Sequence, residues 1–553
     1  MDWAIPDQGI VCLIGRGDST KSTVLEALRR TFFPQWNLSF DDADFYLCNP
    51  NNVIKIEAIV GEIPDEFRDL AKYGHWLCGW NKNTQSYAAD PGEGAEEALR
   101  VRLEVSGDLE PSWSVVKNDG DEGVQFRSGD RARVAVSLIG SVSDRHLTWS
   151  RGSILSKLTE SENISSSLAD AARAAKAALE VRRDEDLSHF DQVAEMAENT
   201  ARELGVRVSN SYRAQLDSDA INVRIAGLAL HDGDLPLRQL GLGSKRMLMT
   251  GLQKQALHNP HVTLFDEVEL GLEPHRIARL LKHLKEDRAG QYFLTTHSPV
   301  TLRELDVGDL HVVHGNEGHT DVVAVNKPSI AESIQGRVRS GAEAFLAPRI
   351  IVCEGATEVG FLRGLDDYWS RHPHMNSFAY IGVALFDARS GGSVRGVAED
   401  LQALGFDIAV LADSDRPDQL SAEDVAALRR QGIEVAVWEG NLSIEQRVFA
   451  DLPWNGVLRC IRLAGENLRV DQVIDQVGAR YNGILDHDLV EWVESPQLRT
   501  AVGLSAKENG WFKRQSLARD WAKEISQYLE DPVVQRNDLG VQIANLRRWV
   551  DRV

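Results

Sequence analysis

A glycine, a lysine and a serine near the start of the chain have the spacing of a phosphate-binding loop. In GRGDSTKS, Gly15, Lys21 and Ser22 fit the pattern G-x-x-x-x-G-K-[ST], but Thr20 stands at the second glycine. In such a loop, backbone N–H groups surround the phosphates of ATP, the lysine adds positive charge, and the serine hydroxyl binds Mg²⁺. A side chain at position 20 crowds the approach that glycine permits, so ATP turnover at this predicted site is in question.

Three later segments follow in the order of an ABC-type ATPase. LGLGSKR (residues 240–246) resembles the signature motif that contacts the γ-phosphate of an opposite subunit. VTLFDE (262–267) has the Walker B layout, in which Asp266 would support the metal and Glu267 would polarise the attacking water. LTTHSP (294–299) places His297 at a strand end, within expected reach of the γ-phosphate. The residues expected to bind ATP and its Mg²⁺ are Gly15, Gly17, Lys21, Ser22, Thr23, Gly243, Ser244, Asp266 and His297.

A second group of acidic residues stands at strand ends in the last third of the chain. In IIVCEGATE (350–358), an apolar run ends at Glu354, and Glu358 follows in the first turn of a helix. In IAVLADSD (408–415), a second apolar run ends in Asp413 and Asp415. Ligands collect at the carboxyl ends of parallel strands, and converging carboxylates repel one another unless cations lie between them. Oxygen ligands suit Mg²⁺ or Mn²⁺, and two such ions could hold the attacking and leaving oxygens of a phosphodiester.

Each of these patterns also has an ordinary structural explanation. Glycine turns join many strands to helices, acids commonly end strands and begin helices, and a lone strand-end histidine is often a surface residue. The fixed order of the four ATPase segments makes coincidence improbable, and E-G-x-x-E followed by D-x-D is distinctive. Glu445, which also follows a strand in WEGNLSIE, is a further candidate metal ligand.

The elements that must position these residues predict an α/β protein. Residues 9–15 form a short apolar strand pattern that leads into a helix with Leu25, Leu28 and Phe32 on one face. Strand-like segments follow at 53–60 and 99–105. The alanine-rich stretch 167–180 and an apolar stripe of Val193, Met196, Ala197, Ala201 and Leu204 predict a helical insertion.

A second run of apolar strands separated by amphipathic helices begins at residue 349. Strands that alternate with helices predict parallel sheets in both halves. We expect the ATPase in two parts, 1–150 and 216–340, around a helical insertion at 151–215, and a second α/β domain with a helical C-terminal region at 348–553.

Composition sets further limits on function. The chain has 553 residues, 43% of them hydrophobic and 26% charged, which is ordinary for a globular protein. No apolar run is long enough for a membrane span, and the acidic first residues predict no signal peptide. The five cysteines are scattered and suit a reducing cytoplasm rather than zinc or disulfide frameworks. A net charge of −22 disfavours a broad basic surface for nucleic acid but leaves room for a local one.

An ABC-type ATPase followed by E-G-x-x-E and D-x-D resembles one family over nearly the whole chain. The acidic motifs resemble the Toprim domain, and the combination resembles the OLD (overcoming lysogenization defect) nucleases and the nuclease subunit of Gabija-type phage defence. FDEVELGLEPHR (265–276) looks like the family's D-E-P-E…L-H-P segment with Val268 in place of proline, and THSP (296–299) looks like its histidine loop. Thr20 departs from the family, and Gly17 stands where relatives tend to have asparagine.

The resemblance implies a metal-dependent DNA endonuclease that is gated by nucleotide and acts in phage defence. It implies a homodimer or higher homo-oligomer, with residues 151–215 as the dimerisation element, and leaves room for an accessory protein such as a helicase. The metal ligands would be Glu354, Glu358, Asp413, Asp415 and, less securely, Glu445. The family's catalytic lysine best matches Lys513, with Lys507 in reserve; the ordinary alternative is a surface lysine on an amphipathic helix.

Two other functions fit the same residues. One is a Toprim ribonuclease that uses the same metals, for example on tRNA. The other is a nucleotide-sensing scaffold whose partner does the chemistry, and Thr20 is the feature that favours it.

Overall fold

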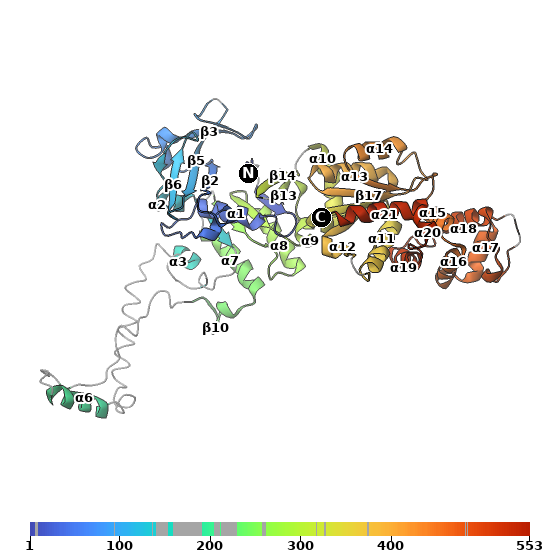
Figure 1. Cartoon of the computed structure of the whole chain (residues 1–553). Helices are drawn as coiled ribbons and strands as arrows, with labels where there is room; N and C mark the ends of the chain where they lie inside the picture. Colours follow the sequence, from blue (N-terminus) through green and yellow to red (C-terminus); the bar gives the residue numbers. More distant parts are fainter. Residues whose placement is uncertain are drawn as a thin grey trace.

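The computed structural model describes most of the chain in two halves that lie side by side (Figure 1). The described residues are 1–5, 9–92, 94–134, 136–139, 147, 153–158, 191–203, 211, 229–256, 261–316, 318–325, 328–372, 375–481, 483 and 485–552. Of the expected insertion, α3 (Ile154–Leu158) and α6 (Asp191–Glu203) are described. The predicted helix at 167–180 lies outside the described residues, as does Leu204 of the apolar stripe.

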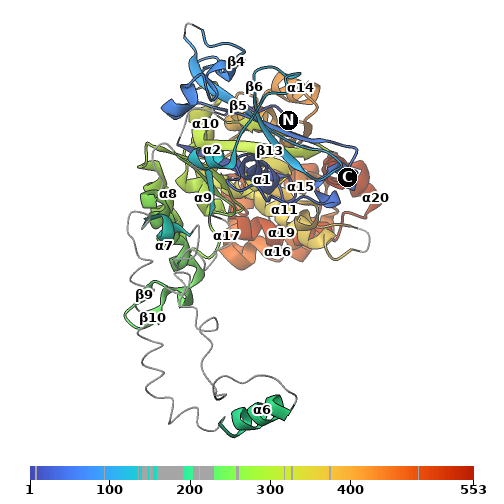
Figure 2. The same cartoon turned by 90° about the vertical axis from the view of Figure 1, so that its left-hand side faces the viewer.

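Helix α6 lies within the range expected for the helical insertion. It lies apart from both halves (Figures 1 and 2), and the side chains of Val193 and Met196 are 62% and 66% exposed. These two side chains of the predicted stripe therefore face solvent within one chain. None of the helices in the described ranges has the length and apolar character needed to cross a lipid bilayer.

The N-terminal half is built around a sheet whose described strands run in the order β14-β13-β1-β12-β11-β8. The strands are β1 (Ile10–Ile14), β8 (Val136–Ile139), β11 (His261–Phe265), β12 (Gly290–Thr295), β13 (Leu310–Asn316) and β14 (His319–Ala324). All neighbours pair in parallel except β13 and β14, which form a hairpin. Every residue of β1 is buried, as expected for a central strand covered on both faces. The parallel sheet predicted for the ATPase half is confirmed.

A second sheet in this half is antiparallel, a pairing that the sequence analysis did not predict. The predicted strand at 53–60 is β2 (Ile54–Val60), and the one at 99–105 is the end of β5 (Glu96–Val105); the two pair antiparallel. The segment between them holds short 3₁₀ turns and the small strands β3 (Cys78–Asn81) and β4 (Ser86–Ala88). A parallel pair needs a long crossover, usually a helix, and no helix is described between β2 and β5.

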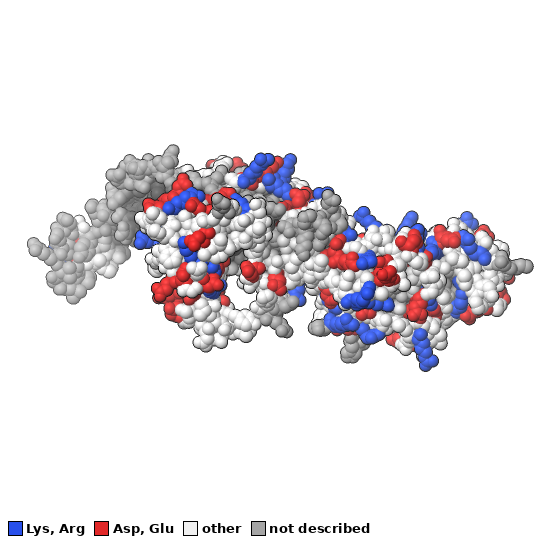
Figure 3. Space-filling view, turned by 90° about the horizontal axis from the view of Figure 1, so that it is seen from above, with Lys and Arg blue, Asp and Glu red and all other residues white. Residues whose placement is uncertain are grey.

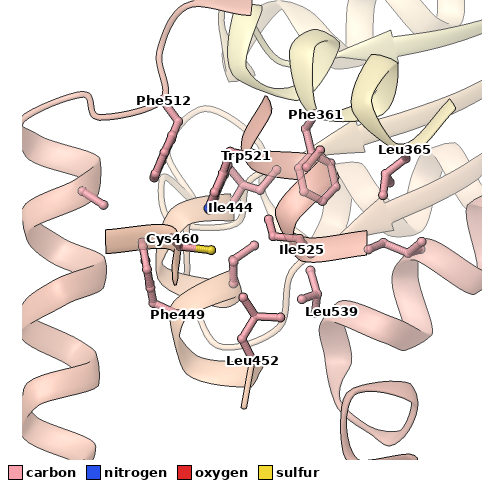
Figure 4. Close-up of a cluster of buried hydrophobic side chains, with 14 of the residues drawn as sticks. Phe361, Leu365, Ile444, Phe449, Leu452, Cys460, Phe512, Trp521, Ile525 and Leu539 are labelled. Atoms are coloured by element: carbon pink, nitrogen blue, oxygen red, sulfur yellow. The ribbon is translucent and has the colours of Figure 1, made fainter. Parts of the chain in front are cut away.

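The second half is a parallel sheet in the order β16-β15-β17-β18. Its strands match the predicted runs and are β15 (Arg349–Cys353), β16 (Val383–Asp387), β17 (Asp407–Ala412) and β18 (Glu434–Val437). The helices that position the acidic residues are α11 (Ala356–Trp369), α13 (Gly391–Ala403), α15 (Ile444–Asp451), α18 (Pro496–Glu508) and α19 (Gln515–Ser526). Figure 4 shows part of the core that packs α11, α15 and α19 together, with Trp521 stacked on Phe512 at 4.3 Å between ring centroids.

One apolar core runs without a break from the first half into the second. The link is α10 (Pro328–Gly341) followed by the 3₁₀ turn η10 (Ala342–Leu346). A Cβ at Gly341 would lie 2.7 Å from the ring of Phe386, so the end of α10 presses directly on β16. Buried side chains in this continuous core include Leu294, Val312, Ile334, Phe345, Val352, Phe386 and Val410.

Candidate functional site

The phosphate-binding loop follows β1 and has a strained backbone. Gly15 has a φ of 141°, and a Cβ there would lie 2.6 Å from the carbonyl oxygen of Val313, so only glycine fits. Thr20, which replaces the second glycine, has a φ of 68° in the left-handed region and immediately precedes α1 (Lys21–Thr31). A β-branched residue is disfavoured there. The loop therefore keeps the backbone shape of a glycine at position 20 although it carries a threonine.

Lys21 lies over this loop and is almost completely buried. Its Nζ donates to the carbonyl oxygens of Gly15 at 3.0 Å and Arg16 at 2.6 Å. Burial lowers the pKa of Lys21, while Asp18 and Asp266 act in the opposite direction. The ammonium group is therefore held by the loop that would surround a phosphate.

The predicted Mg²⁺ residues meet beside the loop. Ser22 Oγ donates to Asp266 Oδ1 at 2.9 Å, and Thr295 Oγ1 donates to the same oxygen at 2.6 Å. The backbone nitrogen of Glu267 donates to Thr295 Oγ1 at 2.8 Å. Glu267 is exposed with a φ of 48°, a left-handed geometry in which a non-glycine residue stores strain at functional sites. Thr295 is a site residue that the sequence analysis did not single out.

The signature segment packs against the loop that follows β11. Gly243 lies near the start of α7 (Leu242–Ala256), and a Cβ there would lie 2.2 Å from the carbonyl oxygen of Gly271. Ser244 Oγ accepts a 3.0 Å hydrogen bond from Arg276. Arg246 is buried and donates to the backbone oxygen of Asp266 at 2.6 Å. Within one chain, Gly243 and Ser244 thus brace the Walker B loop and make no recorded contact with Lys21 or Ser22.

His297 lies directly after β12 with an exposed side chain. Its backbone nitrogen donates to Glu269 Oε1 at 2.7 Å, and Thr296 Oγ1 donates to Glu269 Oε2 at 2.7 Å. Glu269 therefore holds the histidine loop beside the Walker B segment. The sequence analysis treated Glu269 only as part of the D-E-x-E string and gave it no role.

The second group of acidic residues gathers around Asp413 at the carboxyl edge of the second sheet. Asp413 lies just past β17, and Glu354 lies just past β15. The backbone nitrogen of Asp413 donates to Glu354 Oε2 at 2.9 Å. Asp413 Oδ1 accepts from Trp438 Nε1 at 3.1 Å and from the backbone nitrogen of Ile444 at 2.9 Å. Trp438 is buried and follows β18, a position with no motif that could have marked it in the sequence.

The other acids close in from helices. Glu358 is buried in the first turn of α11 and accepts from the backbone nitrogen of Gly355 at 2.8 Å. Glu445 is buried in the first turn of α15 and accepts from Ser443 Oγ at 2.9 Å. Glu358 thus caps a helix start, as the ordinary explanation expects, and it also faces the charge of Glu445.

The pKa shifts show that these carboxyls lie within electrostatic range of one another. Burial raises the pKa of Glu358 to about 8, and the charges of Glu445 and Glu354 add to the rise. Burial raises the pKa of Asp413 well above its usual value, with further contributions from Glu358, Glu445, Glu354 and Asp415. Burial also raises the pKa of Glu354. A divalent cation would remove this repulsion.

Two lysines of the C-terminal region, one on α18 and one in the loop that follows it, approach the acids. Lys507, in the last turn of α18, forms an ion pair with Asp415. Burial raises the pKa of Glu445, and Lys513 and Lys507 oppose that rise. Lys513 is exposed in the loop between α18 and α19. Lys513 lies outside both helices, so the expected alternative of a place on an amphipathic helix is wrong, while its exposure is that of a surface lysine.

The carboxylates around Asp413 have the right chemistry to bind a cation that prefers oxygen ligands, but their present arrangement is not that of a metal site. The candidate ligands are all carboxylates, and carboxylate oxygens are among the ligands that Mg²⁺ and Mn²⁺ prefer. Within the described part of the chain, no three His, Cys, Asp or Glu side chains converge as a ready-made metal cage. The residues therefore fit the group as a donor set, and the hydrogen bonds of Glu358 and Glu445 show what would have to rearrange.

Comparisons with known proteins bear on the first half. The sequence profile of a family described as "AAA domain, putative AbiEii toxin, Type IV TA system" matches residues 109–303. No curated protein sequence matches the chain. An SMC head domain from Thermotoga maritima is similar in structure at 16% identity and a TM-score of 0.27, covering 58% of this chain and 91% of that one.

Two other solved structures are similar at the same level. An Smc head domain with an extended coiled coil, bound to the C-terminal domain of ScpA and derived from Pyrococcus furiosus, has 13% identity and a TM-score of 0.30, covering 60% of this chain and 93% of that one. Stu0660 of Streptococcus thermophilus has 9% identity and a TM-score of 0.27, covering 61% and 81%.

The matched ATPase family and the assembled site define the first half. The P-loop follows β1, the Walker B acids follow β11, and Ser22 meets Asp266. This half is a P-loop ATPase domain, which implies ATP with Mg²⁺ as its cofactor.

Proposed function

We propose that this protein is a metal-dependent DNA endonuclease of the OLD type, regulated by ATP, that acts in phage defence as a homodimer or higher homo-oligomer. The observation that carries the proposal is the gathering of Glu354, Glu358, Asp415 and Glu445 around Asp413. Their mutual charge repulsion at the carboxyl edge of a parallel sheet supports the proposal of a cation site there. The matched family is described as a putative toxin of a type IV toxin–antitoxin system, which supports a role in defence.

Each residue of the proposed site has a distinct role. The five acids would hold Mg²⁺ or Mn²⁺, which when bound would stabilise the attacking and leaving oxygens of a phosphodiester. Trp438 and the backbone nitrogen of Ile444 fix one oxygen of Asp413. Lys507 offsets the charge of Asp415, and the exposed Lys513 can meet the charge of a phosphate in the transition state.

The surface does not oppose nucleic acid as a substrate. On the face shown in Figure 3, Lys and Arg are interspersed with Asp and Glu over both halves. Although the net charge is −22, this face is therefore not uniformly acidic. Phosphates could therefore approach the lysines locally although the whole chain is acidic.

A cleavage assay on the full chain tests the proposal. Supercoiled plasmid and an RNA such as tRNA are incubated separately with the protein in Mg²⁺ or Mn²⁺, with and without ATP. We expect nicked or linear DNA, and a loss of at least about 100-fold in Asp413→Asn. The matched control is Asp471→Asn, because Asp471 is 71% exposed on another helix. Full cleavage by Asp413→Asn would exclude this site, and cleavage of RNA alone would favour the ribonuclease.

A nucleotide-sensing scaffold is the second candidate, and the backbone of Thr20 favours it. The threonine side chain at this glycine-like position, with a φ of 68°, crowds the close approach of phosphate to the loop backbone. If ATP binds without hydrolysis and neither nucleic acid is cut, a partner protein would have to do the chemistry. If ATP neither binds nor turns over while DNA is still cut, the P-loop takes no part in regulation.

A further inference from the structure

The β13–β14 hairpin contacts the phosphate-binding loop along one side. The carbonyl oxygen of Val313 faces Gly15, as described above, and Arg16 Nη2 donates to the carbonyl oxygen of Gly315 at 2.9 Å. Thr20 Oγ1 and Thr320 Oγ1 are 2.9 Å apart and share a hydrogen bond. The phosphate-binding loop therefore contacts the hairpin both near the start of the loop and at the end of the loop.

The same hairpin contacts the second half of the chain through His314, the residue that follows Val313 in β13. His314 Nε2 is 2.7 Å from the carbonyl oxygen of Leu404, and its ring meets the ring of Phe406 edge-on at 6.0 Å between centroids. Gly405 has a φ of 88°, and a Cβ there would lie 2.5 Å from His314 Nε2. The turn 404–406 is thus fitted closely around this one side chain.

The turn 404–406 joins two elements whose other ends reach the acidic site. It ends α13, and at the start of α13 a Cβ on Gly391 would lie 3.1 Å from Glu354 Oε1. It begins β17, whose last residue Ala412 precedes Asp413. Figure 1 shows β13 and β14 between α1 and the half that contains α13 and β17. A displacement of the turn would therefore act on Glu354 and on Asp413 together.

We propose that the β13–β14 hairpin couples the nucleotide site to the acidic site, with His314 as the positioning contact. This inference rests on the proposed function. Packed interiors pass on small displacements because they have few voids, and energetic coupling needs an element that both sites bias. By linkage, nucleotide changes the state of the acidic site and occupation of the acidic site changes nucleotide affinity by the same factor.

Hydrogen exchange tests the coupling without any need for cleavage. Exchange of peptides that cover 15–22 and 404–412 is measured by mass spectrometry with and without ATPγS and Mg²⁺. The variants are His314→Phe, which keeps an aromatic ring but has no donor for Leu404, and Thr320→Val, which breaks the contact with Thr20. His314→Gln can still donate and should rescue. The control is His319→Phe, since His319 is exposed on the same hairpin and pairs with Asp321.

We expect nucleotide to protect 15–22 in every protein and to change exchange at 404–412 in wild type, His319→Phe and His314→Gln. In His314→Phe and Thr320→Val the change at 404–412 should disappear. An unaltered response at 404–412 in both variants, no response there in wild type, or no protection at 15–22 would each overturn the inference. If His314→Phe does not fold, as judged by its thermal unfolding, Thr320→Val alone decides.

A cleavage arm separates failure of the inference from failure of the proposed function. The ratio of plasmid cleavage rates with and without nucleotide should differ from one by about 5-fold or more in wild type and approach one in the two variants. A protein that cuts nothing but shows the expected exchange pattern would keep the coupling and exclude the nuclease. A protein that cuts DNA with the same nucleotide ratio in all variants would keep the nuclease and exclude the coupling.

Discussion

Ser22 and Asp266, 244 positions apart in the chain, are joined by a 2.9 Å hydrogen bond from Oγ to Oδ1. This bond joins the serine of the P-loop to the acid of the Walker B strand, the two residues predicted to bind the Mg²⁺ of ATP. We expect Asp266→Asn to lower Mg²⁺-dependent ATP binding and to reduce hydrolysis by at least about 100-fold. Asp234→Asn, in an exposed turn, is the control. Radiolabelled ATP binding and phosphate release measure both effects, and an Asp266→Asn protein with wild-type turnover would contradict the site.

We expect Thr20→Gly to relieve backbone strain in the phosphate-binding loop. Removing the Cβ from a residue at φ 68° relieves roughly 1–2 kcal/mol of strain, partly offset by the greater freedom of glycine in the unfolded chain. Thr20→Ala separates this effect from loss of the hydroxyl, because alanine keeps the Cβ but cannot bond to Thr320. We therefore expect a higher unfolding temperature and a higher ATP affinity or turnover for Thr20→Gly than for Thr20→Ala. Equal values for the two variants would show that the missing glycine does not matter.

His311 should make the fold sensitive to acid. It is fully buried on β13 beside Trp3, and burial lowers its pKa from 6.5 to about 4. Between these values the unfolded chain binds the proton more readily, so stability is fully present above pH 6.5 and falls as the pH falls toward 4. The loss from this residue amounts to roughly 3 kcal/mol.

His311→Phe removes the titrating group and keeps an aromatic ring. Urea unfolding at pH 7.5, 6.5, 5.5 and 4.5 should show a shallower loss of stability in the variant than in wild type, with the two curves converging or crossing as the pH falls. Parallel curves would mean that His311 is not the source of acid sensitivity.

Lys513→Gln should lower cleavage of DNA more than it lowers DNA binding. The side chain is exposed beside Glu445 and is proposed to act on transition-state charge, so its loss should reduce the maximal rate by about 100-fold. Lys507→Gln tests the other lysine by releasing Asp415, and Lys523→Gln on α19 is the control. Single-turnover cleavage at saturating protein measures the rates. A large loss in Lys507→Gln with none in Lys513→Gln would reverse the two roles.

Local patterns predicted the strands and the residues at their ends. The apolar runs before Gly15, Asp266, Glu354 and Asp413 became β1, β11, β15 and β17, because such runs are stable only when buried on both faces of a parallel sheet. The meeting of Ser22 with Asp266, and of Asp413 with Glu354, follows from that shared edge.

Contacts between distant side chains could not be read in the same way. Trp438 donates to Asp413 and Glu269 holds the histidine loop, but neither residue stands at a spacing that marks it in the sequence. The antiparallel pairing of β2 with β5 depends on how the intervening turns close, and nothing in a short window shows that. The contact of His314 with Leu404 joins two halves whose packing no local pattern specifies.

The continuous core beneath α10 and η10 has a consequence for how the chain can be handled. Scission between Leu346 and Arg349 would bare apolar faces on both fragments, including Phe345 on one and Phe386 on the other. Each fragment expressed alone should aggregate, and calorimetry of the intact chain should show a single main transition for the two halves. In evolutionary terms, neither the ATPase half nor the acidic half can be exchanged alone, since replacing one would expose apolar residues of the other to solvent.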